Sequence, residues 1–118
     1  MFEPEDIREW RDHDVVDVGG KKIGSLEAVY VDTGTDQPSF ATVTVGMPTK
    51  RRLVFVPLDN ATVGPGYLKV AVDRKVAKEA PSIDVDGELP AEDEPKVFAH
   101  YGMAYKTGAG GERRLGRR

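Results

Sequence analysis

Residues 40–46 read FATVTVG, and in this stretch Ala and Val alternate with Thr. A period of two places the apolar side chains on one face of a β-strand and the threonines on the other. The next apolar run, LVFV at residues 53–56, has no polar face, as expected for a strand that is covered on both sides. Pro57 ends this run because proline has no N–H for a strand ladder. The two runs predict consecutive strands of a mainly β protein.

Strand and turn patterns extend in both directions from this pair. Glycine-rich turns are predicted at residues 17–21 (DVGGK) and 64–66 (GPG), because glycine supplies the positive φ that tight turns need. The strand at residues 23–32 is predicted to have one shared face, made of Leu26, Ala28 and Tyr30. Short strands joined by such turns favour a small closed or nearly closed β-barrel, which leaves no exposed strand edges.

Two short helices are predicted after these strands. The first begins at Asp73, a typical N-cap residue, and ends before Pro81. The second begins near Pro95, since proline is tolerated in the first turn of a helix, and stops at Gly102. The side chains that it presents to the barrel are expected to be Val97, Phe98 and Tyr101.

The chain is predicted to divide into four segments. Residues 1–12 form an N-terminal segment with a short helix, and residues 13–81 form the β-barrel domain. Residues 82–105 contain an acidic connector and then the C-terminal helix, which packs on the barrel. Residues 106–118 are rich in Gly and Arg, with Leu115 as their only large aliphatic side chain, and this composition predicts a disordered basic tail.

Composition and charge exclude several classes of protein. The 118 residues contain no Cys, which rules out disulfides, thiol catalysis and thiolate metal sites. No apolar run approaches the ~20 residues that a membrane-spanning helix needs. The acidic N-terminus lacks the apolar region of a secretory signal, so a cytoplasmic location is expected. Residues 1–103 contain 12 basic and 19 acidic residues, whereas residues 104–118 contain five basic residues and one acidic residue.

The order of these residues resembles the PRC-barrel domain family. GGKKIG at residues 19–24 and VYVD at residues 29–32 match its first hairpin and strand, and the firmest stretch is VFVPL at residues 54–58. HYG at residues 100–102 is similar to the end of free-standing bacterial members. The resemblance covers roughly residues 10–105.

The resemblance implies a β-barrel of about six strands that acts as a docking module and has no catalytic motif. Such domains occur in the cytoplasmic part of the H subunit of photosynthetic reaction centres and in the C-terminal half of the ribosome maturation factor. They also occur as small stand-alone bacterial proteins. The sequence has no run that could form the transmembrane helix of the H subunit, which favours a stand-alone member.

We therefore expect a non-enzymatic docking or adaptor protein that mediates protein–protein interaction. Several aromatic residues exceed what one small barrel needs inside, which favours contact with another chain, including a second copy in a homodimer. The alternative is that the terminal segments use these rings to cover the ends of the barrel. The residues expected to contact a partner are Lys50, Arg51, Arg52, Phe98, Tyr101 and Tyr105.

Two further functions stay open. An RNA- or ribosome-associated factor would use Lys50, Arg51 and Arg52 together with the Arg-rich tail, because cations that neutralise phosphates supply nucleic-acid affinity. Against this, the excess of acidic residues in 1–103 would repel a polyanion. A reaction-centre-like role and a metal- or ligand-sensing role form the third class.

No catalytic residue, cofactor site or metal site is predicted. GGKKIGS at residues 19–25 has the glycine spacing of a phosphate-binding loop, but Ser25 stands where the lysine should be. DVDGE at residues 84–88 resembles half of a calcium-binding loop. The pattern is incomplete, because Gly87 stands where a third oxygen ligand is needed. In Asp12-His13-Asp14, neighbouring side chains on a strand point to opposite faces and cannot converge on one ion without a special turn.

Overall fold

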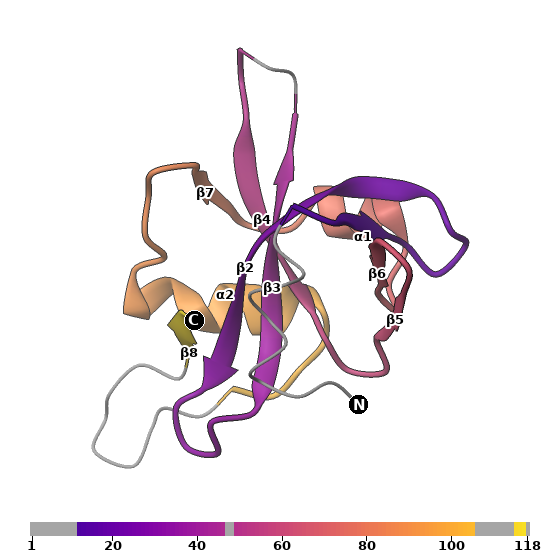
Figure 1. Ribbon diagram of the computed structural model, residues 1–118. Coiled ribbons are helices and arrows are strands. Elements are labelled where there is room, and N and C mark those ends of the chain that lie inside the picture. The colour runs from indigo at the N-terminus through magenta and orange to yellow at the C-terminus, as the bar shows by residue number, and fades with distance from the viewer. Residues whose placement is uncertain (1–11, 47–48, 106–114, 118) are drawn as a thin grey trace.

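The fold is mainly β, as the alternating pattern predicts (Figure 1). This computed structural model describes residues 12–46, 49–105 and 115–117. The strands are β1 (Asp14–Val16), β2 (Lys22–Asp32), β3 (Pro38–Val45), β4 (Arg52–Pro57), β5 (Thr62–Gly64), β6 (Tyr67–Lys69), β7 (Ser82–Asp84) and β8 (Leu115–Arg117). The helical elements are α1 (Arg74–Lys78), the 3₁₀ turn η2 (Ala91–Asp93) and α2 (Glu94–His100).

The strands form one sheet in the order β5-β6-β1-β2-β3-β4-β7, and β8 pairs with β2 beside this path. All neighbours are antiparallel except β1 and β6, which are parallel. The long strand β2 uses one edge for β3 and shares the other edge between β1, at residues 22–25, and β8, at residues 30–32. One strand therefore joins the beginning, the middle and the end of the chain.

Two parts of the barrel prediction need correction. The described residues contain eight strands rather than about six, and in them no pairing joins β5 to β7, so the path is open. The extra strands are β7 and β8, which lie in the segments expected to be an acidic connector and a disordered tail. Each is only three residues long, and so short a segment carries no strand periodicity of its own.

The core consists of two clusters of apolar side chains. The first cluster contains Val15, Ile23, Leu26, Val29, Ala41, Val43, Val45, Val54, Val56, Leu58, Leu68, Val70, Ala77 and Ala80. The second contains Ala28, Tyr30, Phe40, Phe55, Leu89, Val97, Phe98 and Leu115. Strand β4 contributes alternately to both, with Val54 and Val56 in the first and Phe55 in the second, which confirms that it is covered on both faces.

The predicted shared face of β2 is wrong in one respect. Leu26 belongs to the first cluster, whereas Ala28 and Tyr30 belong to the second. The register of β2 against β3 shifts between Leu26 and Ala28. A bulge inserts an extra residue and turns the following side chains to the other face, which simple alternation does not reveal.

Both predicted helices are present with their expected ends. Asp73 caps α1, and its side chain accepts a hydrogen bond from the N–H of Lys75 at 2.8 Å. Helix α2 buries Val97 and Phe98 in the second cluster and ends before Gly102, whose φ of +68° is the left-handed conformation typical of a helix end. No helix in the described ranges is long and apolar enough to cross a membrane.

The tail prediction is wrong for residues 115–117, which form β8 against β2. Leu115 is 1% exposed, so the one large aliphatic side chain of the tail enters the core. The predicted N-terminal helix falls within residues 1–12, and of this segment only residue 12 is described. Residues 106–114 and 118 of the tail also lie outside the described residues.

Truncation of Phe55 tests the importance of the second cluster. Its ring is fully buried and packs against Tyr30 at a centroid distance of 5.0 Å. We expect Phe55→Ala to lower the free energy of unfolding by about 3–5 kcal/mol, because the substitution removes buried area and leaves a cavity. Val63→Ala, at a side chain that is 43% exposed, should change it by less than about 0.5 kcal/mol. Urea denaturation measures both values, and equal effects would contradict the assignment of the core.

Candidate functional site

A basic hollow lies where three strand ends meet helix α1. Its volume is about 440 Å³, and it is bordered by the start of β2, the end of β3, the start of β4 and α1. Its charged lining residues are one acid and four cations: Asp12, Lys22, Arg51, Arg74 and Lys78. Since residues 1–103 contain 12 basic and 19 acidic residues, this is a local concentration of positive charge on an acidic domain. We call this hollow the basic groove.

Two glycines shape the strands beside the basic groove. A Cβ on Gly24 would lie 2.0 Å from the carbonyl oxygen of Thr44, so β2 and β3 approach this closely only with glycine at this position. Gly46 has a φ of +101°, and a Cβ there would lie 2.4 Å from the carbonyl oxygen of Lys50. The positions of the β3 end and of Arg51 therefore depend on both glycines.

The carboxylate of Asp17 fixes the end of α1 that carries Arg74. Its Oδ2 accepts a hydrogen bond from the N–H of Arg74 at 2.9 Å. Its Oδ1 accepts from the N–H groups of Lys21 at 2.8 Å and Gly19 at 2.9 Å. These bonds, that of Lys21 first and that of Arg74 next, hold the pKa of Asp17 below its ordinary value of 3.8. One carboxylate thus ties the β1–β2 turn to α1.

Arg52 holds the other end of α1. Its Nη2 donates to the carbonyl oxygen of Lys78 at 3.0 Å. The last carbonyls of a helix have no donor within the helix, and a cation there also interacts favourably with the helix dipole. With Asp17 at one end and Arg52 at the other, the five-residue helix is anchored twice. Arg74 and Lys78 are four residues apart and therefore share one face of α1.

Within the described part of the chain, three of the four groove cations have no ion-pair partner. Lys22 is the exception, since its Nζ lies 3.2 Å from Oδ1 of Asp14. The side chains of Arg51, Arg74 and Lys78 make no ion pair with any residue in the described ranges. The arrangement can hold an anionic ligand without first breaking an internal pair.

The predicted basic triplet is divided by the structure. Arg51 lines the basic groove, Lys50 is exposed in the turn before β4, and Arg52 is used internally to hold α1. Sequence reasoning missed Lys22, Arg74 and Lys78 because they come from segments far from Arg51 in the chain. The i, i+4 spacing of two basic residues in a predicted helix was the available signal for Arg74 and Lys78.

The aromatic residues predicted to contact a partner make contacts within the chain. Phe98 is 7% exposed, and its ring packs edge-on against that of Tyr105 at 5.0 Å. The hydroxyl of Tyr101 donates to the carbonyl oxygen of Phe55 at 2.6 Å, and burial raises the pKa of this phenol. The hydroxyl of Tyr105 donates to Oε1 of Glu94 at 2.8 Å. These rings close the second cluster, and their contact with a partner stays a prediction.

The histidines do not belong to a cluster of ligands. No group of three or more His, Asp or Glu side chains able to hold a metal ion occurs in residues 12–46, 49–105 or 115–117. Nε2 of His100 lies 2.7 Å from the carbonyl oxygen of Val76, and its ring packs edge-on against Tyr101. Nδ1 of His13 is buried and has no hydrogen-bond partner in the described part of the chain.

The model of the PRC-barrel domain family matches residues 4–77. The chain belongs to the PRC-barrel family. The PRC-barrel match confirms the resemblance read from the turn and strand motifs, and it ends within α1, so β1 to β6 lie inside it and β7, α2 and β8 lie beyond it. No curated protein matches the sequence.

The role of Asp17 can be tested by replacing its charge. We expect Asp17→Asn to lower the thermal midpoint by several degrees at neutral pH, because hydrogen bonds from N–H groups to a charged acceptor are the stronger kind. The folded-state pKa of Asp17 lies below 3.8, so its contribution is complete above that value and is lost as the pH falls through the folded-state pKa. Thermal melts across this range should show the difference between the two proteins shrinking on acidification.

Asp59→Asn is the matched control for this test. Asp59 is exposed and has no hydrogen bond or ion pair in the described residues, so its loss should leave the midpoint nearly unchanged. A difference for Asp17→Asn that stays constant on acidification, or that the control reproduces, would contradict the role assigned to the carboxylate.

Proposed function

We propose that this PRC-barrel protein is a non-enzymatic docking module that binds an acidic segment of a partner protein in the basic groove. The observation that supports this most directly is the convergence of Arg51, Arg74 and Lys78 on one hollow without ion-pair partners among the described residues. Membership of the PRC-barrel family agrees with an interaction module. A cytoplasmic bacterial setting and a homodimer stay predictions from the sequence.

The groove is suited to binding because its cations sit on anchored backbone. Arg74 and Lys78 belong to a helix whose two ends are held by Asp17 and Arg52. Binding to positions that are already fixed costs less ordering entropy than binding to a mobile loop. Charge complementarity of this kind steers the encounter and selects partners by the sign of their charge.

An acidic peptide fits the groove better than RNA does. Among the described residues that line it there is no aromatic ring on which a base could stack. Two of the cations expected to serve an RNA site are also engaged internally, since Arg52 bonds to the carbonyl of Lys78 and Arg117 pairs with Glu27. Residues 1–103 carry seven more acidic than basic residues, which disfavours a long polyanion. RNA is therefore the alternative ligand that the binding experiment must distinguish from an acidic peptide.

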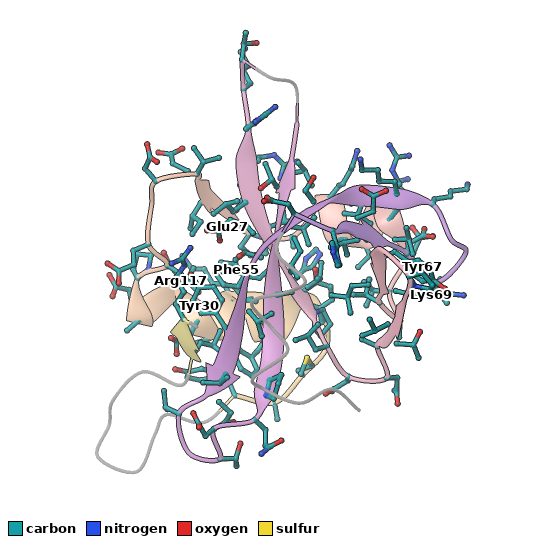
Figure 2. All side chains as sticks on the ribbon, viewed as in Figure 1. Glu27, Tyr30, Phe55, Tyr67, Lys69 and Arg117 are labelled. Carbon is teal, nitrogen blue, oxygen red and sulfur yellow. The ribbon has the colours of Figure 1, made fainter. Side chains whose placement is uncertain are left out.

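The test is titration of a fluorescently labelled oligoglutamate peptide into the full chain. We expect the double variant Arg51→Glu/Arg74→Glu to lower the affinity at least about tenfold, because it reverses two groove cations. The control is Lys69→Glu/Lys96→Glu, which makes the same change in net charge at two exposed lysines outside the groove (Figure 2 labels Lys69). Fluorescence anisotropy at low and moderate salt measures both.

The results of this titration distinguish peptide binding in the basic groove from a net-charge effect and from RNA binding. Equal losses for the two double variants would show that only net charge matters and would contradict the groove as the site. No binding of the peptide to the wild-type protein at low salt would also contradict the proposal. A labelled single-stranded RNA that binds more tightly than the peptide, with the same dependence on Arg51 and Arg74, would replace it with the RNA-associated function.

A further inference from the structure

Strand β8 binds to a part of the domain that lies far from it in the sequence. It pairs in antiparallel register with residues 30–32 of β2, on the edge that β1 leaves free. Figure 2 shows Arg117 beside Tyr30 on this side of the molecule. Each of the three residues of β8 meets a different kind of surface, and together these surfaces form what we call the β8 site.

The first position of the β8 site accepts a large apolar side chain. Leu115 is 1% exposed and lies in the second core cluster with Phe55 and Phe98. Its N–H donates to Oε2 of Glu94 at 3.3 Å, and Glu94 is itself fully buried. The other oxygen of Glu94 accepts from Tyr105. The first position thus contacts both the apolar side chain and the backbone N–H of the residue that occupies it.

The second position accepts a small residue. A Cβ on Gly116 would lie 3.4 Å from Cγ2 of Thr33 and 3.8 Å from Cγ2 of Val31. These are ordinary contact distances, so a methyl group fits at this position. A residue as small as glycine or alanine is therefore suited to this position.

The third position accepts a cation. The guanidinium of Arg117 forms an ion pair with Glu27, and this hydrogen bond raises the pKa of Arg117. Both side chains line a hollow of about 360 Å³ together with Asp86 and Glu88. Three carboxylates and one guanidinium line this hollow and give it an acidic character, opposite to that of the basic groove.

We propose that the β8 site is a strand-binding site for an extended basic segment of a partner protein, with leucine, a small residue and arginine in succession, and that β8 occupies it in the absence of the partner. Charge complementarity supports this occupant, because residues 106–118 contain five basic residues and one acidic residue and Arg117 lines an acidic hollow. Addition of a strand to a free sheet edge is an established way of binding extended peptides. The inference goes beyond the proposed function, since it concerns different residues and a partner of opposite charge.

The contacts of β8 are suited to reversible binding. A three-residue strand makes few backbone hydrogen bonds, and short terminal elements open locally more easily than the core. A segment tethered to its own site has an effective concentration on the order of millimolar. A free peptide of the same sequence therefore competes poorly with β8, and it should bind well only after β8 has been released.

The experiment uses a labelled peptide with the sequence of residues 112–118, ERRLGRR, and the full chain. We expect Leu115→Asp to release β8, because it places a carboxylate at a buried position, and to bind the peptide at least about tenfold more tightly than the wild-type protein. Arg117→Glu, at a half-exposed side chain, should release β8 without introducing a charge at a buried position, and it serves as the second variant. Circular dichroism verifies that each variant is folded.

Two controls make the readout specific. A peptide in which leucine and glycine exchange places has the same charge and should bind severalfold more weakly, since the apolar residue then faces the small position. Adding Glu27→Gln to Leu115→Asp should also weaken binding severalfold, because it removes one partner of the arginine.

Four outcomes would overturn the proposal. They are no binding to either folded variant, equal binding to the wild-type protein, equal binding of the exchanged peptide, and no effect of Glu27→Gln. A concentration-dependent dimer of the wild-type protein that disappears in Leu115→Asp would instead assign the site to β8 of a second copy. None of these results depends on the basic groove, so the failure of one proposal is distinguishable from the failure of the other.

Discussion

Strand β4 is buried on both faces, and this constraint organises the rest of the molecule. Leu53, Val54, Phe55 and Val56 are all at most 2% exposed, so the sheet needs a covering layer on each side. Helix α1 with β1 and β6 supplies the layer over the first cluster, and α2 with β8 supplies the layer over the second. A sheet of this size with only one apolar face would need no C-terminal additions.

The covering elements also determine where the charges lie. Helix α1 buries Ala77, the residue Ala80 just after it is also buried, and the helix presents Arg74 and Lys78 to the basic groove. Strand β8 buries Leu115 and places Arg117 in an acidic hollow. In both cases a small number of buried apolar atoms fixes an element whose charged side chains remain near the surface. The two hollows of opposite sign are therefore direct consequences of how the two core clusters are closed.

Much of the fold could be predicted from local patterns. The alternation in residues 40–46, the two-faced run at 53–56, the glycine turns and the caps at Asp73 and Gly102 all correspond to observed elements. The bulge in β2 and the strands β7 and β8 could not, because their conformation follows from pairing with a distant strand rather than from their own residues. Of the candidate site, Arg51 was found from its charge, whereas Arg52, with the same charge, proved to be part of the helix anchor.

The β class, the turns, the helix ends and the membership of the PRC-barrel family could all be predicted from the amino-acid sequence, since each depends on residues that are near one another in the chain. Folding of the whole chain was needed to bring Lys22, Arg51, Arg74 and Lys78 around one hollow and to place Arg117 against Glu27. The difference arises because periodicity and capping are local properties of the chain. The meeting of distant charges depends instead on the strand register, on a bulge and on the closing of two cores, which involve the whole chain at once.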